Sequence, residues 1–180
     1  MHPVTKFLQT NQIISKEGST RWYSVAGSKQ WVPSVTSILS AAGKGEYFDK
    51  WLANQGSWEQ ACKTRDEAAK RGTIVHEISE DLLNGEEVIL DAGPEIVKRI
   101  MCLEEWYNEY QPEVIMQEVM LAFPGIRYAG RFDILARIDN KNVLIDIKTG
   151  GHYKTHDLQA TMYKILWDTI VEHTGAGKEY

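Results

Sequence analysis

The sequence has few cysteines, few prolines and no long hydrophobic run. Only 2 of its 180 residues are cysteine and 5 are proline, and Cys62 and Cys102 form no C-x-x-C pair. A disulfide-stapled secreted fold is therefore not expected, and we interpret both cysteines as reduced thiols in helical segments. No apolar run approaches the ~20 residues that cross a bilayer. We expect neither a membrane partner nor a signal peptide, and a cytoplasmic location.

Internal repeats, low-complexity segments and linkers rich in Gly, Ser or Pro are also missing. A chain of 180 residues with 43% hydrophobic and 25% charged residues is typical of one globular domain, so residues 1–180 are predicted to form a single domain. There is no basic excess either. The net charge is −5, which by itself argues weakly against a nucleic-acid-binding protein.

Hydrophobic periodicity is helical up to about Tyr110 and changes to a period of two after Pro112. Gly72 is predicted to end one helix, and Thr73 to cap the next. The expected elements are two short strands within 21–32 that turn around Gly27-Ser28, helices starting at Ser34, Ser57, Thr73 and Pro94, strands at 114–123, 128–138 and 142–148, and a helix at 155–173. A sheet covered by helices follows, in the α/β or α+β class.

The stretch GRFDILARIDNKNVLIDIKTG places three charged residues in what otherwise reads as two apolar strands. If the turn centres on 140–141, Asp133 faces Lys148, and Asp146 shares their side of the sheet. Charges on a half-buried sheet cost several kcal/mol each unless they are balanced. A cross-strand salt bridge between Lys148 and Asp133 would balance them, and so would a bound metal ion. These residues alone leave both alternatives open.

Four further polar residues lie in or beside these elements. Gln159 and Tyr163 are four residues apart and therefore share one helix face. His76 stands among apolar neighbours in a helix, and Glu118 alternates with apolar residues on the strand before the hairpin. Each has a plainer interpretation when it is taken singly: a solvated glutamine, a core tyrosine, a structural histidine and a solvent-facing strand residue.

Taken together and in this order, these residues resemble the PD-(D/E)XK nuclease superfamily, in its RecB-like branch. That branch has a G-x-x-x-H helix, a G-x-x-D strand, a D-x-K strand and a Q-x-x-x-Y helix, which correspond here to 72–76, 130–133, 146–148 and 159–163. PSVTSIL, followed by FDKWLANQG, is also similar to the opening of phage-type RecB-like exonucleases and of the mitochondrial genome maintenance exonuclease. The resemblance covers residues 22 to about 167.

The resemblance implies a restriction-endonuclease-like core, in which helices flank a central mixed sheet. An N-terminal hairpin and helices would occupy 20–110, and the catalytic sheet with the Q-x-x-x-Y helix would occupy 113–173. Larger relatives continue into further strands beyond this helix. The chain is thus expected to be a minimal version, or to have its sheet edge completed by a second copy or by a recombination or replication protein.

The resemblance also implies a metal site. Asp133, Asp146, the main-chain carbonyl of Ile147 and the imidazole of His76 would hold Mg²⁺ or Mn²⁺, and one imidazole among oxygens shifts the preference toward Mn²⁺. Lys148 would orient or help deprotonate the attacking water and offset charge on the phosphate.

Four other residues receive supporting roles from the resemblance. Glu118 matches the acidic residue on the preceding strand, which binds metal through water or positions the nucleophile. Gln159 and Tyr163 would contact DNA or hold the lysine and the metal ligands in place. Arg131 is two residues from Asp133 on the same strand, so it shares that face and is within reach of a phosphate.

The implied function is a metal-dependent DNA exonuclease that acts on single strands or duplex ends in phage-type recombination, replication or repair. If the chain is viral, the expected location is the host cytoplasm. Two alternatives are a structure-selective endonuclease on the same core and a catalytically silent DNA-binding or assembly module. The sequence has no Walker A motif and no cysteine cluster, so neither ATP nor an iron-sulfur cluster is expected.

Overall fold

The computed structural model describes residues 3–18, 20–25, 28–42, 45–87 and 92–176. Within them, one antiparallel sheet joins β1 (Ile13–Lys16), β2 (Trp22–Val25) and β3 (Val32–Pro33), and the other joins β4 (Glu113–Leu121), β5 (Gly130–Ile138) and β6 (Lys141–Ile145). The mixed α+β class expected from the sequence is confirmed. None of the described helices is long and apolar enough to cross a membrane.

The chain divides into two compact units. The first contains 1–43, 114–146 and 152–180, and the second contains 44–113 and 147–151. Both sheets belong to the first unit, apart from the first residue of β4. The chain passes from the first unit to the second between Asp146 and Ile147, inside the D-x-K motif.

The β5–β6 hairpin has a register two residues away from the expected one. Leu135 pairs with Leu144, and the turn residues are Asp139 and Asn140. Both turn residues have positive φ, 49° and 61°. Aspartate and asparagine tolerate this conformation, and two-residue hairpin turns require it, so the turn forms one residue earlier than expected.

The correct register changes what lies opposite Asp133. Continued one residue past Ile145, where β6 ends, it brings Asp146 across from Asp133. Lys148 lies beyond the strand, so the expected register, with Lys148 directly opposite Asp133, is wrong. A shift of two residues preserves which side chains share a face, and the two aspartates therefore stay on the same side of the hairpin.

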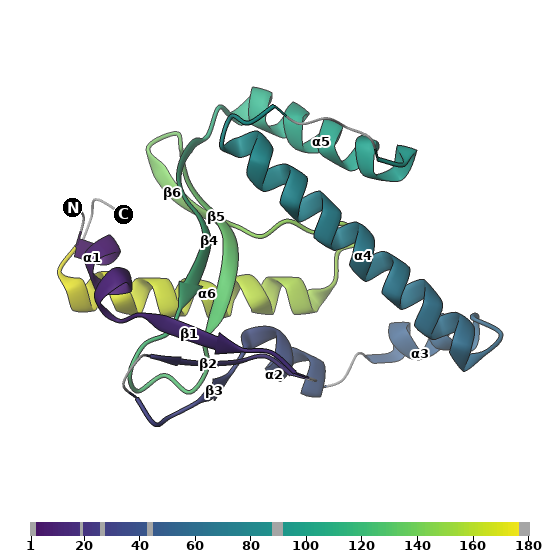
Figure 1. Ribbon diagram of the computed structural model, residues 1–180, viewed down its shortest axis with the longest axis horizontal. Helices are drawn as coiled ribbons and strands as arrows, with labels where there is room; N and C mark the ends of the chain where they lie inside the picture. Colours follow the sequence, from purple (N-terminus) through teal and green to yellow (C-terminus); the bar gives the residue numbers. More distant parts are fainter. Residues whose placement is uncertain (1–2, 19, 26–27, 43–44, 88–91, 177–180) are drawn as a thin grey trace. The chain divides into compact units, whose positions relative to one another are not determined.

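The last helix, α6 (Lys154–Thr174), packs along the β4-β5-β6 sheet of the first unit (Figure 1). It buries Tyr163, Leu166, Trp167 and Ile170, which recur at helical spacing. The Trp167 ring meets Phe132 of β5 edge to face, with ring centroids 6.1 Å apart. The helix lies within one residue of its expected ends, 155 and 173.

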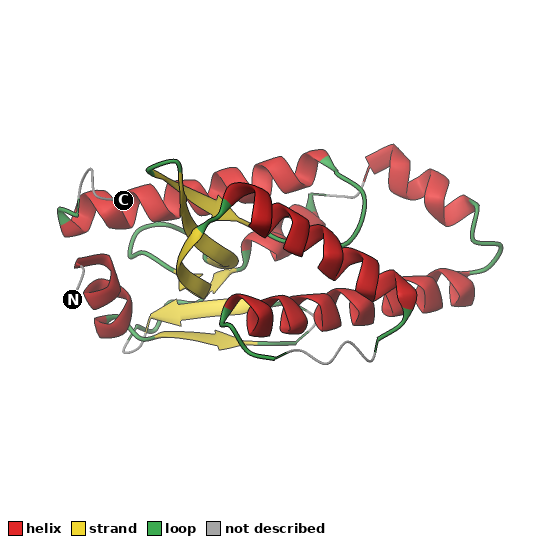
Figure 2. Ribbon diagram, turned by 90° about the horizontal axis from the view of Figure 1, so that it is seen from above, coloured by secondary structure: helices red, strands yellow, loops and turns green. Residues whose placement is uncertain are grey.

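The N-terminal part of the first unit contains elements that the sequence did not predict. Helix α1 (Pro3–Thr10) packs beside α6 (Figure 2), and Phe7 stacks on Phe123 with centroids 5.9 Å apart. Strand β1 was also not expected, because its four residues are mostly exposed and carry no clear alternation. Of the expected turn at Gly27-Ser28, Gly27 lies outside the described residues.

Helix α2 (Val35–Ala41) begins where the sequence indicated. Ser34 is its N-cap, and the Ser34 side chain accepts a hydrogen bond from the Ser37 amide at 2.9 Å. Ser34 also forms an isolated parallel bridge with Ala129, just before β5. The cap therefore anchors α2 to the strand that carries Asp133.

The second unit contains α3 (Gly45–Ala53), α4 (Trp58–Leu83) and α5 (Pro94–Tyr110). The expected break between Gly72 and Thr73 is wrong, because α4 runs through both residues. The Thr73 hydroxyl donates to the Ala69 carbonyl one turn back, at 3.2 Å, and so does not cap a new helix. Ser57 caps α4, as expected.

Substitution of Gly130 is predicted to destabilise the first unit. A β-carbon at Gly130 would stand 2.3 Å from Cε1 of the buried Tyr163 ring, which packs in the core and has little room to move. Gly130→Ala should lower the free energy of unfolding by roughly 1–3 kcal/mol, measured by chemical denaturation. Gly150→Ala is the matched control, because its β-carbon meets nothing within 4 Å. Equal stability of the two variants would contradict this contact.

Candidate active site

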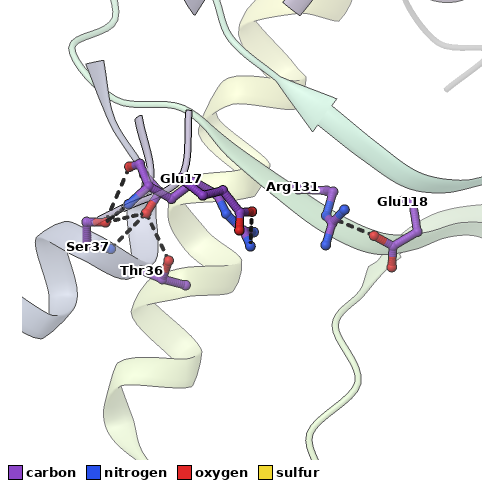
Figure 3. A network of polar contacts seen from close by, with 7 residues as sticks. Glu17, Thr36, Ser37, Glu118 and Arg131 are labelled. Atoms are coloured by element: carbon purple, nitrogen blue, oxygen red, sulfur yellow. Dashed lines mark hydrogen bonds and ion pairs between the residues drawn. The ribbon is translucent and has the colours of Figure 1, made fainter. Parts of the chain in front are cut away.

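Two carboxylates lie close together on neighbouring strands of the first unit. Glu118 on β4 and Asp133 on β5 each offer an oxygen, and the two oxygens lie within 4.8 Å of one another. Both residues are half-buried. Arg131 lies beside them, with its Nε 2.8 Å from Oε2 of Glu118 (Figure 3). Carboxylates this close repel one another, so the pair is stabilised by a cation.

Glu118 has an unusual backbone conformation. Its φ is +50°, in the left-handed region, although it lies inside β4. For a residue other than glycine this conformation costs on the order of 1–3 kcal/mol, and such residues cluster at functional sites. The expectation of a regular, solvent-facing strand residue is therefore wrong, because strand alternation does not hold at this position.

Asp146 is held by the helix behind the hairpin. The Gln159 amide Nε2 donates to Oδ1 of Asp146 at 3.2 Å and to the Tyr163 hydroxyl at 3.0 Å. Gln159 is only 6% exposed, so its plainer interpretation as a solvated residue is wrong. Burial behind Asp146 suits a role in orienting the carboxylate better than a direct contact with DNA.

Tyr163 retains its proton. Burial raises the pKa of Tyr163, the hydrogen bond from Gln159 opposes this shift, and the negative charges of Asp146 and Asp133 reinforce it. The phenol is therefore neutral at neutral pH. The negative charges of Asp133 in the G-x-x-D motif and Asp146 in the D-x-K motif therefore both act on one buried tyrosine.

The remaining motif residues belong to the second unit. His76 is half-buried on α4, and Lys148 is exposed in the segment after β6. Ile147 packs against the cluster formed by Val75 and its neighbours, so α4 and the segment that bears Lys148 share one core. The main-chain carbonyl of Ile147 and the imidazole of His76 thus lie on elements that pack together.

Arg99 of α5 fixes this segment, and no sequence pattern marked it for that role. Its Nε donates to the Thr149 carbonyl at 3.0 Å, one residue after Lys148. Its Nη1 pairs with the exposed Glu95 at 2.8 Å, and this hydrogen bond holds the pKa of Glu95 below its usual value. In the sequence, Arg99 was only one of several basic residues on a helix, because an anchor between α5 and Thr149 depends on the fold.

The residues expected from the sequence are therefore distributed over two scaffolds. The first unit brings together six of them: Glu118, Arg131, Asp133, Asp146, Gln159 and Tyr163. The second unit holds the other three: His76, Ile147 and Lys148.

The donors of the first unit fit a hard divalent cation. Mg²⁺ binds carboxylate oxygens at about 2.0–2.1 Å and Ca²⁺ at about 2.3–2.6 Å, so two oxygens bound to one ion are at most about 4 Å apart for Mg²⁺ and about 5 Å apart for Ca²⁺. The oxygens of Glu118 and Asp133 lie within the larger of these limits. The negative charge of Asp146 acts on the same buried tyrosine as that of Asp133.

The α+β fold sets acidic residues on adjacent strands, with a buried amide behind one of the acidic groups, an arrangement that suits a metal-dependent hydrolase. Comparison with known families is more specific. The model of the PD-(D/E)XK nuclease superfamily matches residues 20–180, and the chain belongs to this superfamily. Membership identifies a nuclease of a class that uses divalent metal ions and acts on DNA. No curated protein and no solved structure matches the chain.

Proposed function

We propose that the chain is a metal-dependent DNA exonuclease of the RecB-like branch, similar to phage-type exonucleases and to the mitochondrial genome maintenance exonuclease. It would act on single strands or duplex ends in recombination, replication or repair. One observation carries the proposal furthest: Asp146 of the D-x-K motif accepts a hydrogen bond from Gln159 of the Q-x-x-x-Y motif. Two motifs separated in sequence thus form one structural group.

The proposal requires both units to act as one nuclease domain. Asp133 and Asp146 lie in the first unit, whereas His76 and Lys148 lie in the second. The chain crosses from a segment of the first unit to a segment of the second within the D-x-K motif, between Asp146 and Ile147. The proposed metal ligands are Asp133, Asp146, the Ile147 carbonyl and the His76 imidazole.

The ligands proposed for Mg²⁺ or Mn²⁺ are oxygens together with one imidazole nitrogen, which suits Mn²⁺ at least as well as Mg²⁺. When bound, the ion supplies positive charge to the scissile phosphate and lowers the pKa of a water molecule. Gln159 fixes the rotation of the Asp146 carboxylate through its hydrogen bond to Oδ1.

The remaining groups serve the substrate and the attacking water. Lys148 orients the water and offsets charge on the phosphate, while Glu118 positions the water from the other strand. Arg131 pairs with Glu118 and is partly exposed, so its guanidinium can also reach a phosphate oxygen. Hydrolysis forms a bond from the water oxygen to phosphorus, breaks the phosphodiester P–O bond in line, and leaves a proton on the departing oxygen.

A substrate comparison tests the proposal. Linear single-stranded, linear duplex and covalently closed circular DNA are each incubated with Mn²⁺, Mg²⁺ or EDTA. An exonuclease degrades linear forms only when a metal is present and spares the circles. Cleaved circles would make it an endonuclease on the same core, and an absence of cleavage with every metal would indicate a DNA-binding or assembly module.

Arg99 is predicted to be a positioning residue for Lys148. Arg99→Lys retains the charge but loses the guanidinium geometry that holds the Thr149 carbonyl, so the segment bearing Lys148 moves. We expect kcat to fall about tenfold, with little change in KM, because a small misplacement of a catalytic group is costly.

Glu95→Gln is the matched control for Arg99→Lys. It removes the ion pair of Arg99 with the exposed Glu95 and leaves the Thr149 contact in place, so kcat should stay near the wild-type value. An equal fall in kcat in both variants would attribute the effect to the Arg99–Glu95 ion pair rather than to the hydrogen bond of Arg99 with the Thr149 carbonyl.

A further inference from the structure

The sheet β1-β2-β3 has one covered face and one face that carries exposed aromatic side chains. Its covered face packs Tyr23 and its neighbours onto Ala122 and Ala129. Since side chains alternate along a strand, Trp22 lies on the opposite face. Trp31 directly precedes β3, whose first residue, Val32, packs on the covered face, and continuing the alternation by one residue assigns Trp31 to the side of Trp22.

The exposed face is mostly apolar. Trp22 is 40% exposed, Trp31 is 41% exposed and Ile14 is 46% exposed. The register pairs Trp22 with Lys16 on one side and with Pro33 on the other. Exposed apolar side chains that gather on one face of a small sheet are typical of a binding surface, and this face carries two tryptophans.

The backbone beneath the two indoles is fixed. The Ser24 hydroxyl donates to the Gln30 carbonyl at 2.8 Å, which ties β2 to the residue before Trp31. The indole Nε1 of Trp22 donates to the Thr20 hydroxyl at 2.8 Å. Continuing the β2–β3 register one residue before Val32 makes Trp31 a diagonal neighbour of Trp22, with their attachment points roughly 7–8 Å apart.

The charge of this segment is opposite to that of the chain. Residues 13–33 contain three cations, Lys16, Arg21 and Lys29, and one anion, Glu17, whereas the whole chain has a net charge of −5. Glu17 pairs with Arg21 at 2.6 Å. Burial disfavours the charge on Arg21, but its interactions with Tyr23 and Glu17 outweigh that effect and raise its pKa, so the cation is permanent. Lys16 and Lys29 are both exposed and suit an anionic partner.

We propose that this face, formed by Ile14, Lys16, Trp22, Trp31 and Pro33, binds single-stranded nucleic acid by stacking unpaired bases on the two indoles. Aromatic side chains on a cationic surface bind single strands in this way, with little sequence preference. The choice of nucleic acid as occupant rests on the proposed function. The face would hold the strand whose end is hydrolysed, and it adds a binding site away from the carboxylates.

The area of the face argues against a second copy of the chain as its occupant. The exposed parts of two indoles and one isoleucine amount to an area on the order of 300 Å². A stable dimer buries about 800 Å² on each partner. One or two stacked bases need much less surface, and the flanking lysines match their phosphates.

The test measures binding of a fluorescent oligothymidylate by anisotropy in EDTA, so that no hydrolysis takes place. Trp22→Ala and Trp31→Ala should each weaken binding about tenfold. Trp22→Phe and Trp31→Phe retain an aromatic face and should bind within a few fold of the wild-type protein. If an alanine variant does not fold, the affinities of the wild-type protein and of the phenylalanine variants for single-stranded and duplex DNA are compared instead. Each of these proteins should bind the single strand more tightly than duplex DNA of the same sequence.

Two controls locate the effect. Trp58→Ala removes an exposed tryptophan from the first turn of α4, in the other unit, and should leave binding unchanged. Lys16→Ala should make the negative slope of log binding constant against log salt concentration shallower by about 0.7, the value for one phosphate contact with a single strand. Wild-type affinity in both alanine variants, an equal loss in Trp58→Ala, or equal affinity for duplex DNA would each overturn the proposal.

Further outcomes separate this proposal from the proposed activity. Sedimentation that shows a dimer abolished by Trp22→Ala, with unchanged DNA binding, would assign the face to a second copy and overturn the proposal. If linear DNA is not hydrolysed but oligothymidylate binding depends on the two indoles, the exonuclease activity fails and the binding surface stands. If DNA is hydrolysed and the tryptophan variants bind normally, the surface alone fails.

Discussion

Asp146→Asn is expected to abolish hydrolysis of DNA, with a fall in kcat of roughly a thousandfold. The substitution removes one negative charge from the group that Asp133 and Asp146 form around Tyr163. The Gln159 amide can still donate to the asparagine oxygen, so the local structure should persist. The measurement is single-turnover cleavage of linear DNA with Mn²⁺.

A second readout for Asp146→Asn does not depend on activity. An ion that binds only the folded protein raises the melting temperature as its concentration increases. Mn²⁺ should therefore raise the Tm of the wild-type protein and raise that of Asp146→Asn much less. Asp139→Asn is the matched control, because it removes an exposed carboxylate from the turn of the same hairpin, where asparagine accepts the positive φ. Full activity of Asp146→Asn would refute the proposed metal site.

Lys148→Ala is expected to lower kcat by about a hundredfold to a thousandfold. Removal of one group that stabilises a transition state electrostatically has an effect of this size. Lys148 is exposed and lies outside the cores of both units, so the fold should be unaffected. Since lysine is not a proposed ligand, the Mn²⁺-dependent rise in Tm should remain. This combination distinguishes Lys148 from Asp146, whose substitution removes both activity and the metal effect.

Lys154→Ala is the matched control for Lys148→Ala. Lys154 is the first residue of α6, is exposed and carries the same charge, but it belongs to no motif. Its substitution should change kcat by less than about twofold, because solvent-exposed charges interact only weakly with other groups. A Lys148→Ala protein that cleaves at the wild-type rate would remove the lysine from the mechanism.

The motif residues show which features of the proposed site the sequence patterns predicted and which they missed. Strand alternation placed Asp133 and Asp146 on one face, and this survives the two-residue error in register because faces repeat every two residues. Alternation failed at Glu118, because its left-handed φ interrupts the strand pattern. Helical spacing showed that Gln159 and Tyr163 share a face, but only packing showed that the face is buried and that Gln159 contacts Asp146.

Helix boundaries show a similar division. Ser34 and Ser57 each satisfy an amide three residues ahead, an interaction that depends only on local sequence, and both caps were predicted. Gly72 and Thr73 carry the same local signals but lie inside α4, since a continuous helix can accept a glycine at a cost of about 1 kcal/mol. Packing of Val75 with Ile96 and Ile100 in the second unit offsets that cost.

The sequence by itself determined the α+β class and the superfamily, because periodicity, caps and motif spacing are local properties of the chain. Only the tertiary structure decided the register of the hairpin, the division of the motif residues between two units and the anchor of Arg99 on Thr149. It also decided which tryptophans remain exposed on the N-terminal sheet. These features depend on contacts between residues far apart in the chain, and the sequence of a short segment does not reveal such contacts.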